Sequence, residues 1–180
     1  MWLPALPAVN SAARREVWGL LCAALVLAAD QGSKHWILTG LDLPARHVVP
    51  VLPPLLDLAM VWNNGVTFGL MQAGSPLGVG LLITLAVIII CGLAFALLRA
   101  ERIYLALCYG AIGGGAVGNV IDRLHYGRVV DFIHVHWGSF DPFPFVFNVG
   151  DSAIVVGVAL LLLDSFLSPP PGLPNPPPAA

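Results

Sequence analysis

Two aspartates lie in surroundings where an ionised carboxylate is costly. Asp131 is the lone acid of the apolar segment Val129 to Ile133, and Asp151 opens an apolar stretch. Two carboxylates brought together at low dielectric share a proton, so that one is ionised and the other is not. Such a pair can take a proton from water and hydrogen-bond a scissile carbonyl, which is the chemistry of an aspartic protease. The alternative roles are structural: a surface carboxylate for Asp131 and a helix-dipole partner for Asp151.

More charged and polar side chains flank the apolar stretches. Asp30 and Lys34 are four residues apart, which places opposite charges on one helix face. Asp122 and Arg123 are a second potential ion pair, for which a structural role at a helix end is at least as good an interpretation. Ionisable groups near hydrocarbon are expensive and indicate a functional site. Anchoring of helix ends explains a single residue such as Asp164 better than it explains several neighbouring clusters.

The composition defines the class of protein. Of the 180 residues, 58% are hydrophobic and only 10% are charged, whereas about a quarter of the residues in a soluble domain are charged. The formal net charge of −2 provides no basic surface, so we expect no nucleic-acid partner. The composition therefore predicts an integral membrane protein.

Hydropathy predicts four membrane-spanning helices. Crossing a bilayer takes about 20 mostly apolar residues, and the spans are expected at about 17–38, 76–98, 103–122 and 148–167. They form one domain over 16–167, after a leader over 1–15 and before a Pro-rich, disordered tail over 168–180. Two short β segments, Arg46 to Val51 and Leu58 to Trp62, predict a small sheet outside the membrane.

If the chain crosses the membrane four times, most of its polar residues fall on one membrane face. The clusters are Asp30 to Lys34, Asn63 with Asn64, Asn119 to Arg123, Asp131, and Asn148 to Asp151. Arg14 and Arg15 precede the first span, and Arg99 and Arg102 lie in the shortest loop. Positive charge in short flanking segments favours a cytoplasmic location. The N-terminus is therefore expected in the cytoplasm and the polar clusters at the extracytoplasmic face.

A glycine-rich segment resembles a nucleotide-binding motif but is better explained by helix packing. Gly113 to Gly118 matches G-x-G-x-x-G, yet it lies in an uncharged span with no preceding strand. Gly110, Gly114 and Gly118 share one helix face instead, which lets another helix approach closely.

Three histidines between the third and fourth predicted spans could suggest a metal site. His134 and His136 would point to one side of a strand, with His125 nearby, but no HExxH or CxxC motif accompanies them. We expect neither a metal ion nor another cofactor.

Ordered motifs connect these clusters to a known family. They are Asp30 to Lys34 (D-Q-x-[ST]-K), Asn63 to Phe68 (N-x-G-x-[AST]-F), Gly114 to Arg123 (G-G-A-x-G-N-x-x-D-R), Val130 to Phe132 (V-D-F) and Phe147 to Ser152 (F-N-x-A-D-[SA]). Gly150 departs from the last pattern, in which Ala is usual, but keeps the small size. Together they resemble lipoprotein signal peptidase, the bacterial family also called signal peptidase II or prolipoprotein signal peptidase.

The resemblance implies a site and a substrate. Asp131 and Asp151 would form the catalytic aspartyl dyad, and the residues that shape or support the site would be Asp30, Lys34, Asn63, Gly65, Asn119, Asp122, Arg123 and Asn148. The implied fold is an all-α membrane protein of four transmembrane helices with a small extracytoplasmic β element, in the bacterial cytoplasmic (inner) membrane. The implied substrate is a diacylglyceryl-modified prolipoprotein, cut just before the lipidated cysteine. We expect membrane lipid as a further partner and a monomeric protein.

A different class of function remains open at this point. A small polytopic transporter or channel component could use Asp30, Lys34, Asp122 and Asp151 as an ion or proton relay. A relay places acids at several depths, whereas the two central spans hold none within their apolar stretches.

Overall fold

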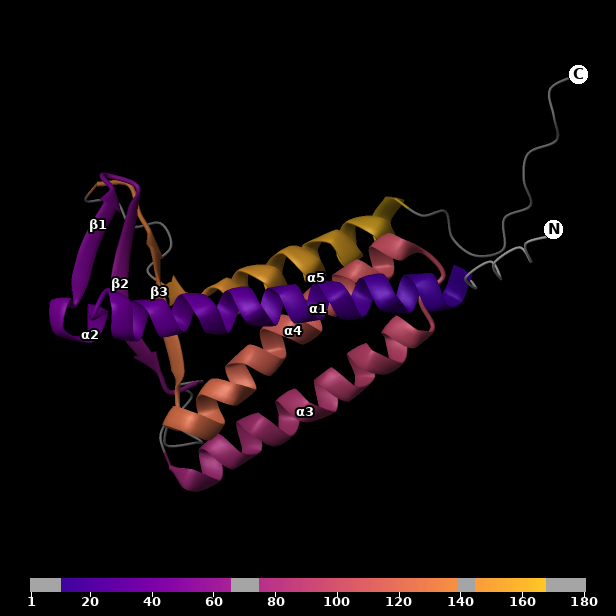
Figure 1. Cartoon of the computed structure of the whole chain (residues 1–180), viewed down its shortest axis with the longest axis horizontal. Coiled ribbons are helices and arrows are strands. Elements are labelled where there is room, and N and C mark those ends of the chain that lie inside the picture. The colour runs from indigo at the N-terminus through magenta and orange to yellow at the C-terminus, as the bar shows by residue number, and fades with distance from the viewer. Residues whose placement is uncertain (1–10, 66–74, 139–144, 168–180) are drawn as a thin grey trace, which may run out of the picture.

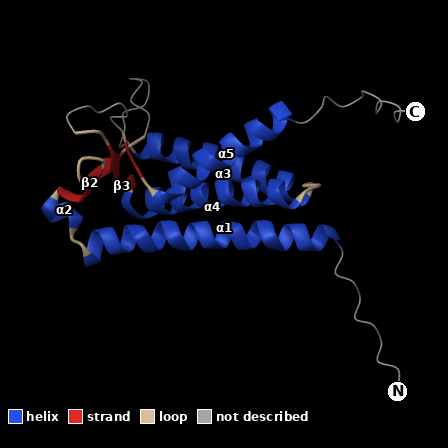
Figure 2. Cartoon of the chain, turned by 90° about the horizontal axis from the view of Figure 1, so that it is seen from above, coloured by secondary structure: helices blue, strands red, loops and turns tan. Residues whose placement is uncertain are grey.

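Long helices and a small sheet make up the computed structural model, which describes residues 11–65, 75–138 and 145–167. The predicted leader up to residue 10 and the predicted tail over 168–180 lie outside the described residues. The long helices are α1 (Ser11–His35), α3 (Pro76–Leu98), α4 (Ile103–Tyr126) and α5 (Val149–Leu167). They extend in one direction from a sheet that covers one end of the bundle (Figures 1 and 2).

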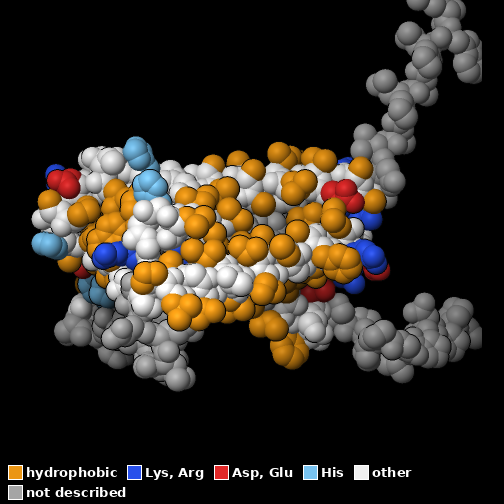
Figure 3. Space-filling model, turned by 90° about the horizontal axis from the view of Figure 1, so that it is seen from below, with side chains coloured by type: hydrophobic (Ala, Val, Ile, Leu, Met, Phe, Trp, Pro, Cys, Tyr) orange, Lys and Arg blue, Asp and Glu red, His pale blue; other side chains and the backbone are white. Residues whose placement is uncertain are grey.

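Three of these helices, α3, α4 and α5, are long and apolar enough to cross a membrane. Their outward faces carry large apolar side chains, and Figure 3 shows hydrophobic atoms spread along the helices with charged groups toward the ends. Helix α1 has 25 residues, but charges at both ends shorten its apolar stretch. The fourth span therefore stays a prediction.

Helix α1 begins at Ser11, so it includes the last residues of the leader predicted over 1–15. Its first turns, from Ser11, contain Ala12, Ala13 and Arg14, which are good helix formers, and no proline or glycine interrupts them. Arg15 Nε donates to the backbone oxygen of Ala100 at 2.8 Å, which ties this end of α1 to the turn between α3 and α4. Arg14, Arg15 and Glu16 are therefore part of α1 and precede its apolar stretch.

Local sequence explains where the other helices end. Ser75 caps α3 by accepting a hydrogen bond from Gly78 N at 3.1 Å, and Pro76 occupies the first turn. Helix α4 continues to Tyr126, beyond the predicted end at 122, and stops at Gly127, whose φ of 71° suits a glycine cap.

Glycines set the packing of α4 against its neighbours. A Cβ at Gly110 would collide with the backbone oxygen of Gly19, and one at Gly114 would lie 2.5 Å from the backbone oxygen of Ala23. A Cβ at Gly118 would collide with the carboxylate of Asp30. The predicted small face of α4 therefore contacts α1, and it brings the polar ends of both helices together.

The sheet is antiparallel and larger than the two predicted segments. Its strands, in the order β1-β2-β3-β4, are β1 (Val48–Leu52), β2 (Leu56–Asn63), β3 (Val129–Val135) and β4 (Val146–Phe147). A π-helix, η1 (Trp36–Gly40), and a short helix, α2 (Leu43–Arg46), connect α1 to β1. Apolar residues from these connections pack on β3, with Ile37, Leu43, Val130 and Phe132 at the centre. This core fixes β3 at the end of the bundle.

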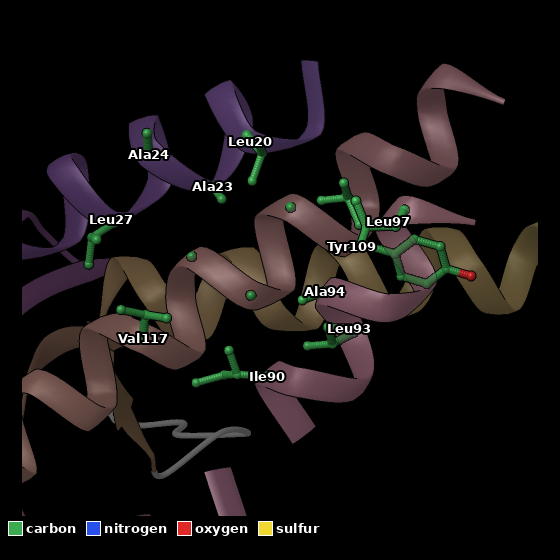
Figure 4. Close-up of a pocket in the computed structure, with 14 residues that line it drawn as sticks. Leu20, Ala23, Ala24, Leu27, Ile90, Leu93, Ala94, Leu97, Tyr109 and Val117 are labelled. Atoms are coloured by element: carbon green, nitrogen blue, oxygen red, sulfur yellow. The ribbon is translucent and has the colours of Figure 1, made fainter. Parts of the chain in front are cut away.

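An apolar cavity of about 410 Å³ opens between α1, α3 and α4. Figure 4 shows Leu20, Leu27, Ile90 and Val117 around it, and α3 diverges from α1 toward the sheet (Figure 1). No charged side chain lines this cavity, so it is separate from the polar cluster.

Candidate active site

Asp131 lies in the middle of β3 and is buried, with only 1% of its surface exposed. Both of its oxygens accept hydrogen bonds: Oδ1 from Asn148 Nδ2 at 2.7 Å and Oδ2 from Asn63 Nδ2 at 2.8 Å. The carboxylate is therefore fixed by two amides that come from different elements. A surface role for this aspartate is ruled out by its burial.

Asp151 lies in the first turn of α5 and is partly exposed. Its Oδ1 accepts from Asn119 Nδ2 at 2.7 Å, and its Oδ2 accepts from the backbone N–H of Asn148 at 3.3 Å. In return, the backbone N–H of Asp151 donates to Asn148 Oδ1 at 2.8 Å. This reciprocal pair is a capping box, so Asp151 serves the helix end as well as the site.

Asn148 connects the two aspartates. The residue is fully buried, and its Nδ2 also lies 3.2 Å from Asn119 Oδ1 and 3.4 Å from the backbone oxygen of Val130. Its amide thus bridges β3, α4 and α5 at one point, and the two carboxylates converge there.

Lys34 and two further acids lie next to Asp131 and Asp151, and Asn119 contacts both Lys34 and Asp151. The Nζ of Lys34 is 2.7 Å from Asp30 Oδ2 and 2.8 Å from Asp122 Oδ2, and it donates to Asn119 Oδ1 at 3.1 Å. All three charged side chains are at least 97% buried. The ion pair predicted between Asp30 and Lys34 is confirmed, but Lys34 is also the partner of Asp122, for which the sequence suggested Arg123.

Asn63 and Gly65 shape the edge of the site. Asn63 Oδ1 accepts the backbone N–H of Gly65 at 2.8 Å, which orients its Nδ2 toward Asp131. Gly65 has a φ of 92°, and a Cβ there would lie 2.5 Å from Leu82 Cδ1. The positive φ favours glycine at this position, and a larger residue would also have to displace the end of the Leu82 side chain.

Residues beyond the predicted set complete the network. Gln31 Nε2 lies 3.0 Å from Asp122 Oδ1 and 3.2 Å from Asp30 Oδ2, so it connects the two acids. The backbone N–H of Gly150 donates to Asp30 Oδ1 at 2.8 Å, and that of Val130 donates to Asp122 Oδ2 at 3.1 Å. Gln31 stands in the same motif as Asp30, which is the signal that could have identified it.

Negative charge exceeds positive charge in this cluster. It holds four acids, Asp30, Asp122, Asp131 and Asp151, and two cations, Lys34 and Arg123. Nη1 of Arg123 donates to the backbone oxygen of Asn119 at 3.3 Å. Burial raises the pKa of Asp131 to about 6, and the charge of Asp151 also raises it, against the lowering effect of the Asn63 and Asn148 amides and Lys34. Excess negative charge at low dielectric favours one retained proton.

A largely apolar groove of about 540 Å³ borders Asp151. Its walls come from the first turns of α5 and from the strand before it, and the lining includes Phe145, Phe147, Ser152, Ile154 and Val155. An extended, mostly apolar ligand in this groove would reach the exposed side of the Asp151 carboxylate.

The ten predicted site residues therefore lie at one end of the bundle, where polar side chains from α1, β2, α4, β3 and α5 meet. The fold and this cluster define a helical membrane protein with a buried, carboxylate-rich site beside an apolar groove. Residues 22–167 match the family described as Signal peptidase (SPase) II. The chain belongs to this family, as the five motifs suggested.

Relatives and solved structures agree with this assignment. The chain is 45% identical to a lipoprotein signal peptidase of Methylobacterium sp. (strain 4-46), over 86% of this chain and 92% of the relative. It is 50% identical to one of Caulobacter vibrioides, over 86% and 90%. A solved bacterial membrane enzyme has a TM-score of 0.68 at 28% identity, covering 87% of this chain and 94% of that structure. Family membership implies a membrane-bound bacterial peptidase and is consistent with cleavage of prolipoprotein signal peptides.

Proposed function

We propose that this protein is an aspartic endopeptidase that removes the signal peptide from diacylglyceryl-modified prolipoproteins, cutting just before the lipidated cysteine. Asp131 and Asp151 are the catalytic residues. The observation that carries the proposal is the convergence of both carboxylates on Asn148, beside an apolar groove.

The dyad hydrolyses the peptide bond with water as the nucleophile. The ionised carboxylate takes a proton from water, while the protonated one hydrogen-bonds the scissile carbonyl and stabilises the developing oxyanion. The proton belongs to the coupled pair, so its position on one aspartate is not a property of either residue alone. No metal or other cofactor takes part.

The other polar residues hold the dyad in place. Asn63, Asn119 and Asn148 donate to the two carboxylates. Gly65 orients Asn63, and the remaining supporting residues, Asp30, Lys34, Asp122 and Arg123, balance charge below the dyad. Supporting groups of this kind keep a site preorganised, which is how they contribute to the rate.

The groove beside Asp151 is suited to a lipidated substrate. A signal helix and a diacylglyceryl group both reside in the bilayer, and the aromatic and aliphatic lining contributed by Phe145, Phe147 and Ile154 offers apolar surface. With the dyad at the end of this groove, the peptide bond can be cut while the signal helix and the diacylglyceryl group both stay in the membrane.

In the membrane, α1 acts as the fourth span. It packs along α4 through Gly110 and Gly114 and ends in the buried charges of the site. The start of α1 and the end of α5 lie away from the sheet, as four crossings require (Figure 1). With the arginine-rich end in the cytoplasm, the sheet and the dyad face the extracytoplasmic side of the inner membrane.

Residues 16–167 then form one peptidase domain, which acts as a monomer, after a cytoplasmic leader and before a Pro-rich tail. The alternative of an ion relay is disfavoured, because the acidic side chains of the described site gather at one end of the bundle.

Cleavage of a diacylated lipobox peptide in detergent tests the proposal. Asp131→Asn and Asp151→Asn should each lower the cleavage rate by about 10²- to 10⁴-fold or more, while the protein still elutes as a folded species. Asp164→Asn is the matched control, since Asp164 pairs with Arg102 at the other end of the bundle, and it should cleave normally. Normal cleavage by both dyad variants would refute the proposal, and a chelator should leave the wild-type rate unchanged.

A further inference from the structure

Two histidines and an aspartate meet at the outer part of the sheet, away from the dyad. Asp57 on β2 is paired with His134 on β3 in the strand register, so their side chains share one face of the sheet. His136 is two residues further along, and its ring stacks on that of His134 with centroids 5.1 Å apart and an interplanar angle of 19°. One ligand atom from each of the three residues lies within 4.8 Å of the others.

The hydrogen bonding of His136 leaves a lone pair directed at a carboxylate. Nδ1 of His136 lies 3.1 Å from the backbone oxygen of Gly138, and because a carbonyl only accepts, Nδ1 carries the proton. In the neutral ring Nε2 then holds a lone pair, and it lies 3.0 Å from Asp57 Oδ2. Nε2 is buried and has no hydrogen-bond partner within the described residues. Two acceptors at this distance repel each other unless a proton or a metal ion lies between them.

We propose that Asp57, His134 and His136 bind a divalent transition-metal ion, with Zn²⁺ as the ion that fits best. Imidazole nitrogen and carboxylate oxygen are common zinc ligands, and a backbone carbonyl that fixes the second ring nitrogen is the usual support of a ligating histidine. Ligand atoms of a tetrahedral zinc ion lie about 3.3 Å apart, given metal–ligand distances of about 2.0 to 2.2 Å. The closest pair, His136 Nε2 and Asp57 Oδ2, is 3.0 Å apart, near this spacing, and the ligand atom of His134 lies within 4.8 Å of both, so that it must move closer when the ion binds.

Three protein ligands leave one coordination position for water. The cluster is partly exposed, with side-chain exposures of 15% for His136 and 20% for Asp57, so an ion can enter from solution. Figure 3 shows histidine side chains at the sheet end of the molecule.

The metal ion is a structural link and takes no part in cleavage. Side chains alternate along a strand, so His134 and His136 share a face with Phe132, and Asp131 points to the other face. The ion ties β2 to the end of β3. Because β2 ends at Asn63, which donates to Asp131, this link supports the strand pairing that carries part of the site. The sequence analysis considered only the histidines, because Asp57 lies far from them in the chain and joins them through strand pairing.

Zinc binding to the full-length protein in detergent tests the inference. The protein carries no histidine tag, is stripped with a chelator, and is then titrated with ZnCl₂ in a calorimeter. Wild type should bind one equivalent, and Zn²⁺ in about hundredfold excess over the dissociation constant should raise Tm by roughly 5 °C or more. X-ray absorption of the loaded protein should show two imidazole nitrogens at about 2.0 Å.

Variants separate this site from other surface histidines. Asp57→Asn, His134→Gln and His136→Gln should each weaken binding by at least about tenfold, since even the loss of a supporting group has that effect. His125→Gln, an exposed histidine at the same end, should bind as wild type does. Peptide cleavage by each variant shows that it is folded. Absence of zinc binding by the wild type, or binding that all three ligand variants retain, would overturn the inference and leave a protonated His136 paired with Asp57.

Discussion

The side-chain amide of Asn148 donates a 2.7 Å hydrogen bond to Oδ1 of buried Asp131. The same residue is the N-cap of α5, where it accepts the backbone N–H of Asp151 at 2.8 Å. One side chain therefore starts a helix and sets the position of two carboxylates that come from different elements. The stability of α5 and the geometry of the proposed dyad are coupled through this amide.

Replacement of Asn148 should affect stability and activity together. Asn148→Ala removes the cap, at about 1 kcal/mol, and leaves Oδ1 of buried Asp131 without its donor, at about 1–3 kcal/mol more. We also expect a fall in cleavage rate of about 10² or more. Ser75→Ala is the control, because Ser75 caps α3 in the same way but touches neither aspartate. It should lose only the cap contribution of about 1 kcal/mol and cleave at the wild-type rate. Equal rates for the two variants would argue against a positioning role of Asn148.

Lys34 should be essential for stability because it is the partner of two buried acids. Lys34→Met leaves Asp30 and Asp122 without their cation, and breaking a buried ion pair in this way costs about 3–5 kcal/mol. Arg102→Met breaks the more exposed pair with Asp164 and should cost about 1 kcal/mol or less. Denaturant unfolding in mild detergent measures both. Adding Asp122→Asn to Lys34→Met should recover part of the loss, and no recovery would contradict the charge argument.

The pKa of Asp131 predicts how activity depends on pH. Burial raises this pKa from 3.8 to about 6, so the free enzyme loses the proton of the dyad as the pH rises through this value. A dyad with both carboxylates ionised has no donor for the scissile carbonyl. We therefore expect kcat/KM to fall above about pH 6, by about tenfold per pH unit at its steepest. A flat profile between pH 5 and 8 would show that the dyad keeps its proton by other means.

The same pKa has a consequence for folding. The folded state binds this proton more tightly than the unfolded state, so stability is greatest below the unfolded pKa of 3.8 and falls as the pH rises toward about 6. Asp131→Asn removes the titrating group. Tm measured from pH 4 to 7 should fall less steeply in this variant than in the wild type.

The close contact of α1 and α4 should make neighbouring glycines behave differently. Gly114→Ala places a Cβ 2.5 Å from the backbone oxygen of Ala23, so the helices must separate, at a cost of about 1–3 kcal/mol. Gly113→Ala meets nothing within 4 Å and should be neutral or stabilising, since alanine favours the helix. Thermal unfolding in detergent should give a lower Tm for Gly114→Ala than for Gly113→Ala. Equal values would mean that the small face of α4 does not set the packing.

Local spacing was enough to predict several parts of this protein. Long apolar runs predicted α3 and α4, and the four-residue spacing of Asp30 and Lys34 placed an ion pair on one helix face. The segments Arg46 to Val51 and Leu58 to Trp62, separated by a Pro-Pro pair, indicated two short strands, and the structure confirms the antiparallel pair of β1 and β2 there. Each of these signals depends on neighbours in the chain, which a sequence displays directly.

Contacts between distant segments could be decided only by the tertiary structure. Lys34 reaches Asp122 because glycines allow α1 and α4 to touch, and Asp57 meets His134 because β2 pairs with β3. Asn148 becomes the link between Asp131 and Asp151 only when β3 and α5 share one end of the bundle. The sequence by itself predicted which polar residues gather at one end of the bundle, since hydropathy and chain direction suffice for that. Which of them touch depends on strand register and helix approach, and these follow from packing across the whole fold.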